Sequence, residues 1–255
     1  MVKSNLSKNF GEHNMKKTLV IIIVCAVIVT VMVGSLNTAS STEHSTIGSD
    51  DRGYVTKDVY PQKDTLDSKW ASFTGDSPQK KVKVAIVTGI HPRETLSMNV
   101  SSAAIKDYAK SHNVEIVHYS IVVNANFDYY TLGRNRGQGL AADYIIPDVA
   151  KSDYDLVIIC HDHKKGYGDG FYIATPSMDN KSVTLAQKVD SAMPGIRFLP
   201  SDANPKKKGT STEIFTKPLA ATGHPTFVYE IPEWLGYNEA YNVTYNLIET
   251  CYNSI

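Results

Sequence analysis

The chain has 255 residues, with 26 basic and 26 acidic side chains and a formal net charge of zero. This length is compatible with a single domain. The balanced charge gives no overall field that would attract nucleic acid, so no nucleic-acid partner is expected. Three cysteines are too few for a disulfide scaffold, and a bridge between Cys160 and Cys251 is left open.

The first 36 residues have the pattern of a membrane-directed segment. Four lysines and one glutamate precede an almost unbroken apolar run from Leu19 to Val33. A signal-peptide core has about 7–15 apolar residues and a spanning helix about 20, so the run lies between the two classes. The basic flank predicts that residues 1–17 are cytoplasmic. We expect residues 18–36 to be a single-pass anchor or, alternatively, a cleaved signal segment, with the rest of the chain outside the cytoplasm.

Residues 37–53 are rich in Ser and Thr and lack apolar periodicity. This composition is typical of a flexible stalk that cannot bury a core. The folded domain is therefore expected to span residues 54–255, which is long enough for a single hydrophobic core.

Apolar strand-like runs alternate with helical patterns along this domain. Strands are predicted over residues 83–88, 114–123, 155–160 and 226–229, and helices over residues 97–112, 181–192, 212–222 and 238–252. The alternation predicts a three-layer α/β/α fold with a mixed, mostly parallel sheet. In such sheets, functional residues gather at the carboxyl ends of the strands.

Ionisable residues directly follow three of the predicted strands. His91 and Glu94 stand three residues apart after the first, and His161 and Glu230 each follow a later one. Such groups are rarely buried without partners, so we expect them to meet at one rim. Two imidazoles and a carboxylate with an open fourth position are typical of a hydrolytic zinc site, and the remaining carboxylate would be a general base. His163 is an alternative to His161, or a residue that faces the substrate.

In these residues the sequence resembles the zinc carboxypeptidase superfamily, which includes the succinylglutamate desuccinylase and aspartoacylase-like deacylases. The resemblance rests on His91-x-x-Glu94, on His161 at a strand end and on Glu230 at the end of Pro-Thr-Phe-Val-Tyr-Glu. It covers the chain from about residue 81 to the carboxyl end. It implies that His91, Glu94 and His161 bind Zn²⁺ and that Glu230 is the general base.

The resemblance also implies an arginine that polarises the scissile carbonyl, a task for which a permanent guanidinium charge is suited. Arg134 and Arg136 both lie in the expected stretch, and the sequence does not decide between them. The superfamily then has an Asn-Arg pair that grips a terminal carboxylate. This chain has Asp143 and Tyr144 in that region, and we expect them to contact the substrate instead.

Together, these patterns predict a membrane-anchored, extracytoplasmic, zinc-dependent hydrolase that cleaves a peptide or amide bond. A peptide or an N-acyl amino acid is the expected substrate. Cell-wall peptides are candidates because the domain would lie just outside the membrane. The alternative is a metal-free binding or structural protein at the cell surface that kept the fold, since the Asn-Arg pair is missing.

Overall fold

The computed structural model describes residues 41–63, 81–124, 129–200 and 211–255. The predicted cytoplasmic segment 1–17 and the predicted anchor or signal segment 18–36 lie outside the described residues. Among the helices that are described, none combines the length and the hydropathy needed to span a bilayer.

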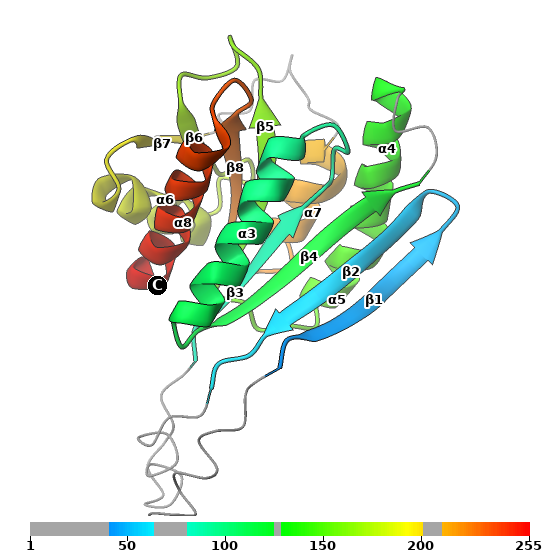
Figure 1. The fold of residues 1–255 in the computed structure, drawn as a ribbon, viewed down its shortest axis with the longest axis horizontal. Helices are drawn as coiled ribbons and strands as arrows, with labels where there is room; N and C mark the ends of the chain where they lie inside the picture. Colours follow the sequence, from blue (N-terminus) through cyan, green and yellow to red (C-terminus); the bar gives the residue numbers. More distant parts are fainter. Residues whose placement is uncertain (1–40, 64–80, 125–128, 201–210) are drawn as a thin grey trace, which may run out of the picture. The chain divides into compact units, whose positions relative to one another are not determined.

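The core of the domain is one mixed sheet (Figure 1). Its strands are β1 (Glu43–Asp50), β2 (Gly53–Tyr60), β3 (Lys83–Thr88), β4 (Glu115–Val123), β5 (Leu156–His163), β6 (Phe171–Ala174), β7 (Ile196–Leu199) and β8 (Thr226–Pro232). They are arranged in the order β1-β2-β4-β3-β5-β8-β6-β7. The central strands β4, β3, β5 and β8 are parallel, whereas the β1–β2 hairpin and β6 join the sheet in antiparallel pairs. The mixed sheet is as predicted.

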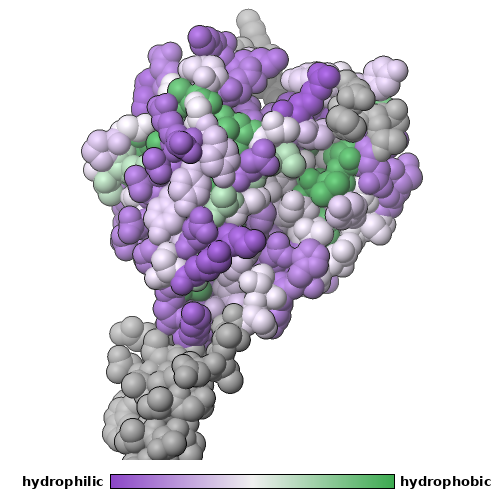
Figure 2. Space-filling model, viewed as in Figure 1, coloured by the Kyte–Doolittle hydropathy of each residue, from purple (hydrophilic) through white to green (hydrophobic). Residues whose placement is uncertain are grey.

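Helices cover both faces of this sheet (Figure 1). One face is covered by α3 (Thr95–Ser111), α6 (Asn180–Ala192) and α8 (Tyr237–Ser254). The other face is covered by α4 (Tyr130–Leu140), the π-helix η1 (Ala141–Ile145), α5 (Ile146–Val149), the π-helix η2 (Thr212–Thr216) and α7 (Lys217–Ala220). Successive side chains of a strand point to opposite faces. Val84 and Ile86 of β3 therefore belong to one core, and Ala85 and Val87 to the other. The outer surface seen in Figure 2 is mostly hydrophilic, with small separate hydrophobic patches.

The folded domain begins before the predicted boundary at residue 54. Within the predicted stalk, residues 43–50 form β1, which pairs with β2 from Glu43↔Val59 to Asp50↔Gly53. β1 is an edge strand with mostly exposed side chains, and it is held by backbone hydrogen bonds to β2. Such a strand needs no apolar alternation. Its polar composition therefore resembled that of a stalk.

Four of the predicted elements agree closely with the structure. β3 coincides with the predicted strand 83–88, and α3, α6 and α8 agree with the predicted helices to within two residues at each end. β5 continues beyond residue 160 to His163 because it pairs with β8 as far as His163↔Pro232. Cys160 and Cys251 are both buried and free, so the bridge left open by the sequence is not formed.

A buried histidine in β4 is expected to make the stability of the fold depend on pH. His118 is 4% exposed, and its Nε2 lies 2.9 Å from Thr88 Oγ1. Burial lowers the pKa of His118 to about 4. Below pH ~6.5 the unfolded chain is protonated at this residue while the folded chain is not. The free energy of unfolding should therefore decrease as the pH is lowered from ~6.5 to ~4, by at most about 1.4 kcal/mol per pH unit.

His118→Gln can still hydrogen bond to Thr88 but cannot titrate. We expect its free energy of unfolding, measured by urea denaturation between pH ~4 and ~7, to depend less steeply on pH than that of the wild type. All other titrating groups are present in both proteins. Identical slopes would contradict the prediction.

Candidate metal centre

The turn after β3 brings His91 and Glu94 to the same side. Gly89 begins it with φ of 84°, and a Cβ at this position would lie 2.3 Å from the Ile121 carbonyl oxygen of β4. Only glycine fits such a conformation and such a close approach. The Glu94 backbone N–H then donates a hydrogen bond to the His91 carbonyl oxygen, at 3.0 Å, just before α3 begins.

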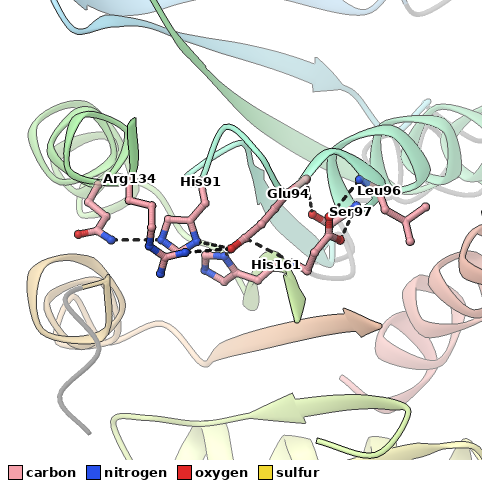
Figure 3. A network of polar contacts seen from close by, with 8 residues as sticks. His91, Glu94, Leu96, Ser97, Arg134 and His161 are labelled. Carbon is pink, nitrogen blue, oxygen red and sulfur yellow. Dashed lines mark hydrogen bonds and ion pairs between the residues drawn. The ribbon is translucent and has the colours of Figure 1, made fainter. Parts of the chain in front are cut away.

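His91, Glu94 and His161 converge at the carboxyl ends of β3 and β5 (Figure 3). Glu94 Oε1 lies 2.7 Å from His91 Nδ1, and Glu94 Oε2 lies 2.6 Å from His161 Nδ1. The two imidazole rings are 4.5 Å apart between centroids. One possible ligand atom from each of the three residues lies within 4.8 Å of the others. The three predicted ligands therefore meet in a cluster that could hold a metal ion.

The charges of this cluster suit a cation. Burial opposes ionisation of Glu94, but His161 and His91 hold the pKa of its carboxyl well below the usual range. Burial, assisted by His161, lowers the pKa of His91 to about 4. Burial would lower the pKa of His161 too, but the Glu94 carboxylate raises it above the usual value. A metal ligand must be deprotonated. At neutral pH Glu94 is ionised and His91 is a neutral imidazole, so neither adds a positive charge that would repel a cation.

Asp162, between the two candidate histidines of β5, ties this strand to α3. Its Oδ2 accepts a hydrogen bond from the Leu96 backbone N–H at 3.0 Å, and its Oδ1 accepts one from Ser97 N–H at 2.7 Å (Figure 3). Its own backbone N–H donates to Glu94 Oε2 at 3.3 Å. Asp162 thus caps the first turn of α3 from a neighbouring strand, a role that the sequence did not reveal.

Loss of this cap should destabilise the protein. Asp162→Ala leaves two backbone N–H groups at the start of α3 without their acceptor, so the free energy of unfolding should fall by about 1–2 kcal/mol. Asp162→Asn keeps an acceptor and should lose less. Urea denaturation at neutral pH measures both values. If the alanine variant were as stable as the asparagine variant, the capping role would be refuted.

A cavity of about 590 Å³ opens over the cluster. Glu230 also lines it, on β8, directly beside His161 in the register of the two parallel strands. Burial raises the pKa of Glu230 to about 7. A carboxyl group with this pKa can exchange a proton near neutral pH. The structure therefore brings the fourth predicted residue to the same cavity as the three candidate ligands.

The two candidate arginines point in different directions from α4. Arg134 lines the cavity, and its Nη1 lies 3.2 Å from Glu94 Oε1 (Figure 3). Arg136 donates a hydrogen bond to the Asp51 carbonyl oxygen at 3.3 Å and does not line the cavity. Residues two apart lie on nearly opposite sides of a helix. The geometry thus places Arg134, and not Arg136, where a substrate carbonyl could reach it.

Asp143 and Tyr144, predicted to contact the substrate, do not reach the cavity. They lie on η1 against the β1–β2 hairpin. Asp143 Oδ2 accepts a hydrogen bond from Arg52 at 2.6 Å, and the Tyr144 hydroxyl donates to Asp50 Oδ2 at 3.0 Å. These polar contacts hold the amino-terminal hairpin to the rest of the domain. The predicted placement is corrected accordingly.

His163 lines the cavity but is not in the ligand cluster. Its Nε2 lies 2.9 Å from the Gly170 carbonyl oxygen, and its ring packs edge-on against Trp234 with 5.2 Å between centroids. Of the two histidines left open by the sequence, the geometry places His161 with His91 and Glu94.

Gln138 is a residue of the site that the sequence analysis missed. It is fully buried, and its Nε2 lies 3.1 Å from His91 Nε2. It follows Arg134 by four residues, so the two side chains share one face of α4. This spacing is a signal only once residues 130–140 are known to be helical.

No protein-family model matches the sequence, and no curated protein is significantly similar to it. Among solved structures, a metallo-carboxypeptidase from Burkholderia cenocepacia superposes with a TM-score of 0.56 at 12% sequence identity, over 87% of this chain and 67% of that protein. The chain has a metallo-carboxypeptidase fold. The resemblance found in the sequence motifs is thereby confirmed at the level of the fold.

Two other solved structures superpose on this chain with lower TM-scores. The cell shape determinant protein Csd4 from Helicobacter pylori has a TM-score of 0.48 at 12% identity, over 84% of this chain and 54% of Csd4. An aspartoacylase family protein from Mesorhizobium loti has a TM-score of 0.49 at 10% identity, over 86% of this chain and 68% of that protein. The chain thus spans only about half the length of Csd4.

Proposed function

We propose that the protein is a zinc-dependent hydrolase of peptide or amide bonds. The cluster of His91, Glu94 and His161 at the cavity, with Glu230 beside it, is the observation that carries the proposal. Two imidazole nitrogens and one carboxylate oxygen are a donor set that suits zinc. With three protein ligands, the fourth position is left for water or substrate, as hydrolytic zinc sites require.

The residues of the cavity can share the work of hydrolysis. A bound zinc ion would act as a Lewis acid and would lower the pKa of water. Glu230 takes a proton on its carboxylate and returns it to the leaving amine, a role for which a pKa of about 7 is suitable. Arg134 stabilises the negative charge that develops on the carbonyl oxygen, because its guanidinium is always charged and its donors are fixed.

The proposed substrate is a peptide or an N-acyl amino acid. Since Asp143 and Tyr144 lie away from the cavity, a free carboxylate of the substrate would have to be bound by other side chains. Arg93 and Lys164 line the cavity and carry the required positive charge. Cell-wall peptides are the proposed source of the substrate, and this choice rests on the expected position of the domain outside the membrane.

We propose that residues 18–36 anchor the chain in the cell membrane, with residues 1–17 in the cytoplasm and the hydrolase domain outside. The apolar run and its basic flank support this orientation. Cleavage after this segment would instead release a secreted enzyme. Extraction of cell membranes with alkaline carbonate distinguishes the two, because only an integral anchor stays in the membrane fraction.

The function is tested by zinc analysis and by a substrate screen on the purified full-length chain. We expect about one zinc per chain and release of an amine or amino acid from wall-derived or N-acylated peptides, with the released end showing which bond is cleaved. Protein that contains no zinc and does not hydrolyse these substrates would overturn the proposal and favour a metal-free binding protein at the cell surface.

A further inference from the structure

The amide of Gln138 is built into the floor of the metal centre. The side chain is fully buried, and α4 can lie against the chain beside His91 because residue 137 is glycine. A Cβ on Gly137 would lie 2.1 Å from the Ile90 carbonyl oxygen. Gln138 is therefore held at its place next to His91 by backbone packing, and Gln138 Oε1 is buried without a hydrogen-bond partner among the described residues.

The two nitrogens of His91 face different partners. Nδ1 lies 2.7 Å from Glu94 Oε1, and Nε2 lies 3.1 Å from Gln138 Nε2. A neutral imidazole carries its proton on one nitrogen and accepts a hydrogen bond on the other. In the arrangement seen here, Nδ1–H donates to the Glu94 carboxylate, and Nε2 accepts from the Gln138 amide N–H. Gln138 Oε1 is then left without a hydrogen-bond partner among the described residues.

Metal binding would reverse these roles at His91. The nitrogen that faces Glu94 and His161 must lose its proton to become a ligand. The ring stays neutral if one proton leaves Nδ1 and water supplies one to Nε2. The new Nε2–H then needs an acceptor. Rotation of the Gln138 amide by half a turn exchanges its N–H₂ for the unpartnered Oε1 and provides that acceptor.

We propose that Gln138 is a positioning residue for the metal centre, with an amide that donates to His91 in the metal-free site and accepts from it in the loaded site. The proposal rests on the proposed zinc-dependent function. An amide can play both parts because it holds a donor and an acceptor. Partners of this kind fix the tautomer and ring orientation of a histidine ligand, and their loss typically lowers metal affinity about 10–100-fold.

The first test compares the zinc affinities of full-length wild type, Gln138→Met and Gln138→Glu by competition with a chelator. Methionine has a similar volume but offers no acceptor of comparable strength, so the zinc affinity of Gln138→Met should be about 10–100-fold lower than that of the wild type. Glutamate can accept a hydrogen bond from His91 Nε2–H, so the zinc affinity of Gln138→Glu should be close to that of the wild type. If the methionine variant binds zinc as tightly as the wild type, Gln138 has no positioning role. If the wild type itself binds no zinc, the proposed function fails instead.

The second test leaves Gln138 unchanged. Nitrogen-15 NMR of histidine-labelled wild type reports which ring nitrogen of His91 carries the proton, and a His91→Ala spectrum assigns the signal. We expect the proton on Nδ1 in metal-free protein and on Nε2 after addition of zinc. A proton that stays on Nδ1 in the zinc-loaded protein would overturn the proposal.

Discussion

Replacement of Glu230 by Gln is expected to lower turnover by a factor of about 10²–10⁴ while zinc binding is retained. Glutamine has nearly the same shape as glutamate but cannot take up a proton at neutral pH. Glu230 lies beside His161 in the strand register and lines the cavity, yet it is not in the His91–Glu94–His161 cluster. Its loss should therefore affect the reaction rather than the metal site. Initial rates on a cleaved peptide, together with zinc content, measure both effects.

Glu249→Gln is the matched control, since it makes the same change at an exposed position of α8 outside the cavity. Its rate should equal that of the wild type. Wild-type turnover by Glu230→Gln would refute the general-base role and leave the metal centre in need of another proton acceptor.

Replacement of His161 by Ala is expected to abolish both zinc retention and activity. One of three candidate protein ligands is lost, so zinc affinity should fall by more than the ~100-fold that the loss of a supporting partner costs. A ligand that binds only the folded state raises the melting temperature. Added zinc should therefore raise the Tm of the wild type but not that of His161→Ala. Zinc content after dialysis and thermal unfolding with and without zinc measure the effect.

His163→Ala is the control that separates the two neighbouring histidines. His163 lines the same cavity, but its ring is engaged with Gly170 and Trp234 rather than with the cluster. This variant should keep its zinc and the zinc-dependent rise in Tm. Loss of zinc from His163→Ala, with retention by His161→Ala, would reverse the assignment.

Several features of the fold are readable from local patterns. The strands β3, β5 and β8 are apolar because helices cover both of their faces, and buried parallel strands give continuous apolar runs. Ionisable residues at the ends of such runs conflict with burial, and that conflict pointed to the metal cluster. β1 gave no such signal, because an exposed edge strand is stabilised by its backbone hydrogen bonds.

The contacts that complete the site depend on the directions of side chains. Arg134 and Arg136 are equivalent in the sequence, and the rotation of α4 about its axis separates them by placing only one in the cavity. The same rotation brings Gln138 to His91. Asp143 and Tyr144 lie on η1, which follows α4 in the chain, and they contact the β1–β2 hairpin instead of the cavity.

The sequence by itself determined the α/β alternation and singled out His91, Glu94 and Glu230, because each of these follows an apolar run and the run determines which rim of the sheet it reaches. It left the choice between His161 and His163 open, and the structure decided it. Only the tertiary structure decided that Arg134 faces the cavity, that Asp162 caps α3 and that Gln138 supports His91. Those contacts join segments that are far apart in the chain. They depend on how helices and strands pack against one another, and no local pattern records that packing.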